Sequence, residues 1–393
     1  MRSSFPSLYN KTIAFLALIS IFGSFASGLT WMGLVILSIC MGYLLWKQIL
    51  AGLTRFRPNK YLRYTGYLII AVLMALFIRL FVLEIYMVPT NSMENTLKPG
   101  DVILVNKLAY GPALPRSPLE IPVFSMVCYA FNPNMARDSL WWKFKRFHGY
   151  SKIKNGDVVV FHHRNPKRRN TFFVKRCVGL PGDTLQIKNN QVYVNGQKAL
   201  DQSHIKKQHL IYTNQPSTCK DSLKSQNLHY RIHQNRIIIE LTTAQANKLA
   251  EKPFIDSVVC RSVRYYNKGK LFPRAKNFNW TMDDFGKLII PKKEMKIKLN
   301  NKHHALYKRV IQRLEGVKLI KMGNHYFINN ERSYYYTFKN NYCFMLGDNR
   351  TVSFDSRYWG FLPEEKIIGK VSHILFSVKD KKWQKNKLLM KVE

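Results

Sequence analysis

The stretch Asn155-Gly156-Asp157-Val158-Val159-Val160-Phe161 decides the fold class, because it joins a turn signal to a short apolar run. Asn and Gly favour tight turns, and four consecutive apolar residues after them are typical of a buried strand. Runs of the same kind occur at 102–105, 191–194 and 374–376. We therefore predict a mainly β fold for the part of the chain that follows residue 84.

Helical patterns are few in this part of the chain. The best candidates are 242–252, with Thr242 as a possible N-cap, and 304–315. We expect region 188–340 to be an α+β cap inserted into the β core. It contains Cys219 and Cys260, which are compatible either with a disulfide or with two free thiols. Six cysteines among 393 residues exclude a small scaffold that depends on disulfides.

The N-terminal part of the chain is apolar enough for a membrane. The run 12–46 carries no charge, and as one helix it would be about 50 Å long at about 1.5 Å per residue. A hairpin of two short helices that turns near Ser27-Gly28 fits better, and a single tilted span is the alternative. A second apolar stretch, 64–83, is predicted to be a transmembrane helix, with Arg79 reaching the headgroups.

Basic residues between the two apolar stretches set the predicted orientation. Positively charged loops stay in the cytoplasm, so 64–83 is predicted to run outward and the residues after it to lie outside the membrane. The basic residues of this loop are Lys47, Arg55, Arg57, Lys60 and Arg63.

The formal charge of +39 raises the question of a nucleic-acid partner. A Lys-rich composition, together with attraction to an anionic membrane, explains the same charge. The basic residues are spread over the whole chain, and no known nucleic-acid motif accompanies them. We therefore predict no nucleic-acid partner; a basic nucleic-acid binder stays as an alternative.

Three segments carry most of the chemical information: 88–101, 155–183 and 345–360. In sequence letters they include VPTNSMENTLKPGD, then NGDVVVF followed by FFVKRCVGLPGD, then MLGDNRTVSFDSRYWG. No group of residues has metal-ligand spacing, since His162 and His163 are adjacent and point opposite ways in a strand. We expect neither a metal nor a cofactor.

In the order of these motifs, the chain resembles the bacterial type I signal (leader) peptidases, which are membrane-anchored serine proteases with a Ser/Lys dyad. The matching blocks are 86–111, 155–187 and 345–376. The resemblance implies a signal-peptidase-like β catalytic core with an inserted cap, preceded by transmembrane helices. The implied boundaries are 1–63 for the membrane hairpin (or single span) and basic cytoplasmic segment, 64–87 for the transmembrane helix, 88–187 and 341–393 for the two parts of the catalytic core with its tail, and 188–340 for the cap.

The resemblance also implies roles for individual residues. Ser92 matches the nucleophile, Lys175 the general base, and Thr90 the hydroxyl that helps to form the oxyanion hole. Ser353 matches the serine that holds the lysine, and Asp355 with Arg357 a structural ion pair near the site. The residues that match the lining of the substrate pockets are Val88, Met93, Val160 and Val174.

The residue types suit this chemistry. A serine hydroxyl is a weak nucleophile until a base takes its proton. A lysine can serve only if its pKa falls from about 10.4 toward neutrality, which burial in an apolar setting achieves. Phe172-Phe173-Val174 provide such a setting directly before Lys175.

The first and third motifs depart from the family pattern at several positions. Asn95 replaces a proline, and Asn91 replaces a glycine, although Asn tolerates a left-handed backbone. Thr351 stands where an acidic residue is common, and Thr90 replaces a serine and keeps the hydroxyl. These changes affect the geometry of the loop and remove no group with a chemical role.

The implied activity is removal of signal peptides from exported preproteins at a bacterial cytoplasmic (inner) membrane. The chain would be multi-pass, with its catalytic domain on the periplasmic side, and we expect a monomer whose partners are preproteins and the lipid bilayer. Two rivals are a peptide-binding relative that has lost catalysis and a Ser/Lys self-cleaving repressor. The repressor would need an N-terminal helix-turn-helix, where this sequence has apolar spans.

Overall fold

The structure is a computed structural model, and it divides into two compact units that are described separately. It describes residues 40, 42, 60–131, 142–165, 168–199, 205–226, 228–233, 236–261, 271–275, 278–379, 382–384 and 387–392. The predicted hairpin at 12–46 lies outside these residues, apart from two isolated positions. Unit 1 takes its described residues from Met1–Met87, Gly100–Lys152 and Ile368–Lys391. Unit 2 takes its described residues from Val88–Pro99, Ile153–Ile367 and Val392–Glu393.

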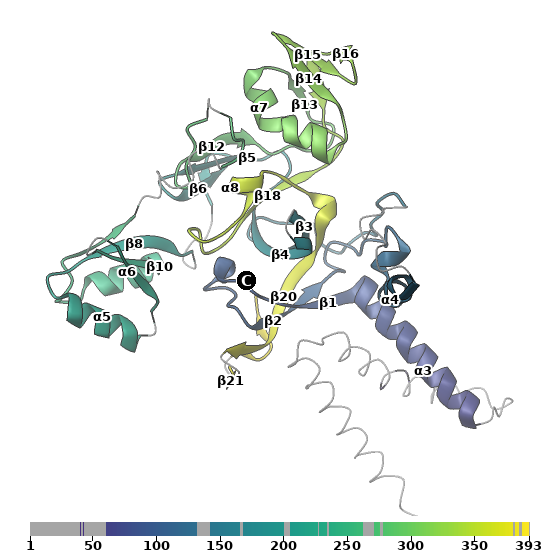
Figure 1. The fold of residues 1–393 in the computed structure, drawn as a ribbon, viewed down its shortest axis with the longest axis horizontal. Coiled ribbons are helices and arrows are strands. Elements are labelled where there is room, and N and C mark those ends of the chain that lie inside the picture. The colour runs from purple at the N-terminus through teal and green to yellow at the C-terminus, as the bar shows by residue number, and fades with distance from the viewer. Residues whose placement is uncertain are drawn as a thin grey trace, which may run out of the picture. The chain divides into compact units, whose positions relative to one another are not determined.

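Among the described residues of unit 1, the first element with given bounds is the long apolar helix labelled α3 (Figure 1). Helix α3 (Lys60–Phe77) continues into a π-helical turn, Ile78–Val82, and the span Tyr64–Val82 is long and apolar enough to cross a membrane. Its large side chains are exposed, as at Leu73 with 60% and Phe77 with 57% of their surface accessible. A bilayer would cover such an apolar surface, which agrees with the prediction of a span at 64–83.

Antiparallel strands follow this helix in unit 1. Strand β1 (Leu83–Met87) pairs with β2 (Asp101–Asn106), and β2 pairs with β20 (Ile367–Lys379). Ile85, Val102 and Phe376 form a small core between them. The remaining elements of this unit are α4 (Pro122–Phe131), the 3₁₀ turn Pro118–Glu120, β21 (Lys382–Trp383) and β22 (Met390–Lys391).

Unit 2 contains the sheet that carries the predicted site. Strand β3 (Val158–Asn165) pairs with β4 (Arg168–Gly179), β4 with β18 (Tyr342–Leu346), and β18 with β19 (Leu362–Pro363), all antiparallel. Every residue of β18 is buried, as expected for an apolar strand with neighbours on both edges. The predictions of strands at 102–105, 158–161, 191–194 and 374–376 are all confirmed.

Between β4 and β18 the chain forms further small sheets of unit 2. The first sheet has the order β12 (Phe285–Ile289), β5 (Thr184–Lys188), β6 (Gln191–Val194), β7 (Gln197–Lys198). The second has the order β11 (Ser257–Cys260), β8 (Lys207–Tyr212), β10 (Arg236–Leu241), β9 (Tyr230–His233). The others are β13 (Lys296–Lys298) with β17 (Tyr335–Thr337), and β14 (Leu319–Met322), β15 (His325–Ile328) and β16 (Glu331–Arg332).

Helices α5 (Pro216–Ser225) and α6 (Thr243–Ala250) supply apolar side chains to the core that β8 and β10 share. Helix α6 has a complete capping box between Thr242 and Gln245, so the predicted N-cap is confirmed. Helix α7 (Asn301–Arg309) continues as a π turn, Val310–Leu314, and starts three residues before the prediction because Asn300 caps it. Helix α8 (Ser356–Trp359) and the 3₁₀ turn Glu364–Lys366 complete this unit.

All six cysteines are free thiols. Of the two alternatives for Cys219 and Cys260, a disulfide or two free thiols, the structure therefore shows the second.

Candidate active site

A short 3₁₀ turn, Asn91–Met93, presents Ser92. Met93, with 1% of its surface exposed, and Leu97, with none, anchor this segment in the core of unit 2, while Asn91 is exposed and Ser92 half-buried. The backbone N–H of Leu97 donates to the carbonyl of Met93 at 2.8 Å. The serine is therefore held at the edge of a fixed loop, where its hydroxyl is accessible.

The backbone of this loop accounts for one departure from the family pattern. Asn95 has a φ of 90°, in the left-handed region. Proline fixes φ near −65° and could not occupy this position, whereas Asn can. Asn91 belongs to the 3₁₀ turn and shows no positive φ, so the left-handed residue follows the serine and does not precede it.

Strand β4 brings Lys175 to the serine. The Nζ atom of Lys175 lies 2.6 Å from the Oγ of Ser92 and 2.9 Å from the carbonyl oxygen of Val174. The amine also lies 5.6 Å from the centre of the Phe173 ring, and only 4% of the lysine surface is exposed. The register pairs Lys175 with Val159 of β3, so an apolar residue covers it across the strands as well.

Burial lowers the pKa of Lys175 from 10.5 to about 8, although the charges of Asp355 and Asp348 raise it. The ammonium form is disfavoured because this apolar setting solvates it poorly. Near neutral pH, a useful fraction of the lysine is therefore neutral and can accept the proton of the serine.

Two further predicted hydroxyls lie near the serine or its support. The Oγ1 of exposed Thr90 donates to the Oγ of Ser92 at 3.3 Å. Ser353 is 2% exposed. The hydrogen bonds of the Lys175 amine go to Ser92 and Val174, and this conformation shows none between Ser353 and the lysine.

Close packing holds Ser353 in place. A Cβ on Gly347 would come within 2.2 Å of the Ser353 Oγ and within 2.5 Å of the Ser92 carbonyl oxygen. Only glycine fits where these two segments approach so closely.

Asp355 and Arg357 form a buried, two-pronged ion pair. The Nε of Arg357 lies 2.9 Å from Oδ1 of Asp355, and NH2 lies 2.7 Å from Oδ2. Burial by itself would raise the pKa of Asp355, but the Arg357 charge and hydrogen bonds from Arg357 and Gly347 outweigh it and lower that pKa. This pair fixes the loop that carries Ser353.

A second buried pair was missed by the sequence reasoning. Arg176 contacts both carboxylate oxygens of Asp348, at 2.9 and 2.8 Å, and the Thr96 hydroxyl donates to the same carboxylate at 2.6 Å. Three segments are thereby joined: β4, the loop after β18, and the loop that carries Ser92. The signal was present, because both charged residues lie in the quoted motifs, but nothing local in the sequence pairs them.

The predicted pocket residues lie close to this site in the fold but not all on one face. Val88, Met93 and Val160 are 3% exposed or less, and Val174 is half-buried. Val160 of β3 pairs with Val174 of β4, the residue directly before Lys175. Side chains alternate along a strand, so these two register positions fall on the opposite face of the sheet from the lysine. Their role in substrate binding stays a prediction.

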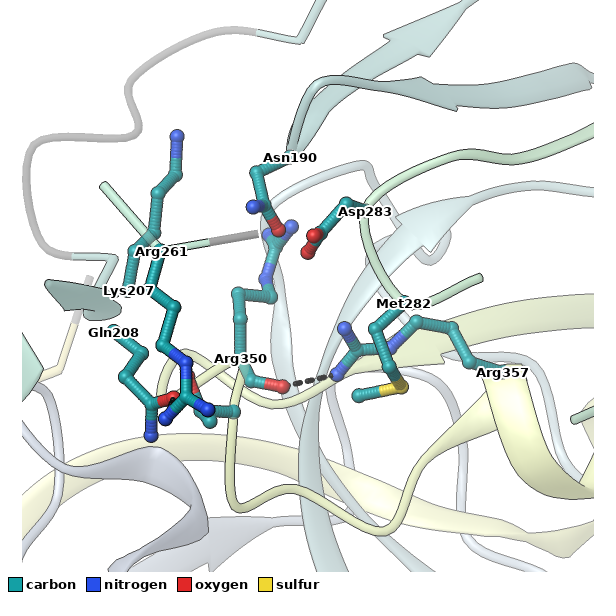
Figure 2. Close-up of a pocket in the computed structure, with 9 residues that line it drawn as sticks. Asn190, Lys207, Gln208, Arg261, Met282, Asp283, Arg350 and Arg357 are labelled. Atoms are coloured by element: carbon teal, nitrogen blue, oxygen red, sulfur yellow. Dashed lines mark hydrogen bonds between the residues drawn. The ribbon is translucent and has the colours of Figure 1, made fainter. Parts of the chain in front are cut away.

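Unit 2 also contains a small pocket with a cationic lining (Figure 2). Arg350 is 4% exposed, and burial together with the charge of Arg357 lowers its pKa to about 10. Neither Ser92 nor Lys175 lines this pocket, so we do not assign it to the reaction. The residues that line it are Asn190, Lys207, Gln208, Arg261, Met282, Asp283, Arg350, Thr351 and Arg357. Across the described parts of the chain, no group of three or more His, Cys, Asp or Glu residues could hold a metal ion.

The arrangement of Ser92 and Lys175 is the one that a serine hydrolase with a lysine base needs. A family model of signal peptidase, peptidase S26, matches residues 61–240 and 285–376. The chain therefore belongs to the signal peptidase family and is a serine peptidase.

Individual relatives agree with this family. The chain is 28% identical over 309 residues to signal peptidase I of Buchnera aphidicola subsp. Schizaphis graminum, covering 78% of this chain and 72% of the relative. It is 37% identical over 123 residues to signal peptidase I of Pseudomonas aeruginosa, covering 31% and 34%. A crystal structure of a signal peptidase I from Enterococcus faecalis V583 is 18% identical, with a TM-score of 0.21, and covers 56% of this chain and 98% of its own. So low a TM-score supports no inference about the fold.

Proposed function

We propose that this chain is a membrane-bound endopeptidase that removes N-terminal signal peptides from exported preproteins, with Ser92 as nucleophile and Lys175 as general base. The observation that carries the proposal is the 2.6 Å distance between the Lys175 Nζ and the Ser92 Oγ in a member of the signal peptidase family. The relatives, which are signal peptidases I, supply the substrate class.

The reaction follows from the two groups. Neutral Lys175 accepts the Ser92 proton while Oγ attacks the carbonyl carbon of the scissile bond. The resulting lysine ammonium then protonates the leaving amine, and an acyl-enzyme ester remains on Ser92. Neutral again, Lys175 takes a proton from water, which hydrolyses the ester and releases the serine.

Two donors suit the oxyanion that develops during this attack. They are the backbone N–H of Ser92 and the hydroxyl of Thr90, which lies 3.3 Å from the Ser92 Oγ. Losing one donor of this kind costs about 3–4 kcal/mol in the barrier. In the proposal, Ser353 holds the lysine, and the Asp355–Arg357 ion pair fixes the loop that carries Ser353.

The substrate would bind in extended form, as a strand added to the sheet. Signal peptides end in a small-residue, A-x-A-like site. Val88, Met93, Val160 and Val174 are proposed to line shallow pockets that admit only small side chains.

The proposed setting is a bacterial inner membrane, with the catalytic part on the periplasmic side of a multi-pass monomer. The span Tyr64–Val82 supports anchoring, and Ser92 follows it closely in the sequence. An anchor confines enzyme and membrane-inserted substrate to one surface, which raises their effective concentration. The division into a catalytic core at 88–187 and 341–393, with a cap at 188–340, belongs to the same proposal.

The test is cleavage of a preprotein by the purified full chain in detergent or lipid. We expect Ser92→Ala and Lys175→Ala each to lower kcat by a factor of about 10⁴ or more, because the nucleophile and its base act together and neither works without the other. Cleavage that survives Lys175→Ala contradicts the proposed base. A wild-type chain that binds preprotein without cutting it supports the rival reading, a non-catalytic peptide-binding relative.

A further inference from the structure

We propose that Lys206, in the inserted region, is a positioning residue for the nucleophile. It acts through Glu94, two residues after Ser92, and through the loop that follows β18. This inference rests on the proposed role of Ser92 as nucleophile. It gives the inserted region a part in catalysis that its distance from the motifs along the chain does not suggest.

The first step is the ion pair between Lys206 and Glu94. The Nζ of Lys206 lies 3.1 Å from Oε1 of Glu94, with 11% and 23% of the two side chains exposed. A lysine so deeply buried needs a carboxylate partner, because an unpaired ammonium there would be poorly solvated. Glu94 directly follows the 3₁₀ turn that carries Ser92, and its own N–H donates to the carbonyl of Asn91 at 3.0 Å. The ion pair therefore restrains the C-terminal end of the 3₁₀ turn that carries Ser92.

The second step is a backbone connection through the same lysine. The N–H of Lys206 donates to the carbonyl of Asp348 at 3.0 Å, and the N–H of Arg350 donates to the carbonyl of Lys206 at 3.1 Å. Lys206 thus pairs as a parallel bridge with Asn349. The N–H of Asn349 in turn donates to the carbonyl of Ser92 at 3.2 Å. Lys206 holds the nucleophile by two routes, one through its side chain and one through its backbone.

The side chain of Asn349 closes the network. Its Nδ2 lies 3.4 Å from Oε2 of Glu94 and 3.0 Å from Oε2 of Glu240, a residue of β10. Glu240 also meets Arg231 of β9 at 3.2 Å. The inserted region therefore contributes two side chains to this network: Lys206, which contacts Glu94, and Glu240 of β10, which contacts Asn349.

The required precision explains why such a restraint matters. The nucleophile must hold its position to well under 1 Å, because a displacement of about 1 Å can cost about 100-fold in rate. A contact that fixes the turn from outside then acts on kcat more than on substrate binding.

The experiment measures preprotein cleavage by the full chain and compares Lys206→Met, Lys206→Arg, Glu94→Gln and the double variant Glu94→Gln/Lys206→Met. We expect Lys206→Met and Glu94→Gln each to lower kcat about 10- to 100-fold, with little change in KM and with the midpoint of the pH profile unmoved. Lys206→Arg should restore most of kcat, and the double variant should lose no more than the worse single variant.

Lys107→Met is the matched control. The side chain of Lys107 is likewise 11% exposed, and it pairs with a glutamate, Glu84, at 2.8 Å in unit 1. We expect it to lower Tm about as much as Lys206→Met while kcat stays near the wild-type value. If Lys206→Met does not fold, the test uses Glu94→Gln and Lys206→Arg. Both variants keep a polar side chain of similar length, and they should still show a lowered kcat and a nearly normal kcat, respectively.

Three results would overturn the proposal: an unchanged kcat in both Glu94→Gln and Lys206→Met, losses that multiply in the double variant, or an equal loss of kcat in Lys107→Met. Ser92→Ala, measured in parallel, separates this failure from that of the proposed function. If Ser92→Ala is inactive and Lys206→Met is not impaired, only the positioning role falls. If Ser92→Ala still cleaves, both proposals fall.

Discussion

Lys175 and Arg176 lie next to each other on β4 and are almost equally buried, with exposed fractions of 4% and 7%. The guanidinium of Arg176 meets the carboxylate of Asp348 at 2.8 Å. Among the described residues, the amine of Lys175 has no carboxylate at ion-pair distance and contacts a hydroxyl and a carbonyl instead. A buried cation with a partner stabilises loops, whereas a buried cation without one gives up its proton and becomes a base.

The largest effect is expected from replacing the unpaired cation. Lys175→Met keeps the length of the side chain and removes the base, so we predict a loss of about 10⁴-fold or more in kcat. The free energy of unfolding should not fall, because no buried ion pair is broken and a poorly solvated amine is removed. Cleavage kinetics and urea unfolding of the same preparation measure both quantities. A marked loss of stability would contradict the claim that Lys175, unlike Arg176, does not stabilise the fold.

Replacing the paired cation should have its main effect on stability. Arg176→Met leaves the fully buried carboxylate of Asp348 without its guanidinium, so we predict a loss of about 3–5 kcal/mol in the free energy of unfolding. Urea unfolding followed by circular dichroism measures it. If the variant is as stable as the wild type, the Arg176–Asp348 pair does not hold the loops together.

A smaller effect is expected from the carboxylates that face the lysine. Asp355 raises the pKa of Lys175 more than Asp348 does. Asp355→Asn should therefore lower the pKa of Lys175 below about 8 and move the midpoint of the pH profile to lower pH, with a smaller shift for Asp348→Asn. At a fixed pH below the midpoint, the neutral fraction should rise by less than about tenfold. A midpoint that moves upward in either variant contradicts this electrostatic account.

The last prediction concerns stability as a function of pH. In the folded chain Lys175 loses its proton near pH 8, whereas its unperturbed pKa is 10.5. Between these values the unfolded chain binds more protons, so Lys175 makes the free energy of unfolding increase as the pH rises. We predict that the difference between wild type and Lys175→Met shows this increase between about pH 8 and 10.5, while below pH 8 it is constant. A difference that is flat over the whole range would mean that the pKa of Lys175 is not lowered.

Local patterns predicted much of the fold. Apolar runs after Gly or Asn turns predicted strands β2, β3 and β6, an apolar run alone predicted β20, and Thr242 marked the start of α6. Helix α5 was missed because it is short and largely polar, although Cys219 and Leu223 are buried one turn apart. A single pair of apolar positions is too weak a signal for a helix.

The candidate site, like the fold, was predictable from the sequence only in part. The quoted motifs led to Ser92 and Lys175 by resemblance, and the structure places the two side chains together. The pairings of Arg176 with Asp348 and of Lys206 with Glu94 join segments far apart in the sequence. No periodicity or spacing links such positions in one sequence, so only the folded chain reveals them. The departure at Asn95 was visible in the sequence, but its physical reason, a φ of 90°, was not.

The pH dependence of kcat/KM on a preprotein substrate tests the central claim most directly, because it reports the ionisation of the free enzyme. His163, whose pKa burial lowers to about 4, does not titrate in the range that matters. With Lys175 as an unpaired buried base, kcat/KM should rise through a single ionisation with a midpoint near pH 8 and then level off. A midpoint near the ordinary lysine value of 10.5, or activity that falls across pH 8, would contradict it.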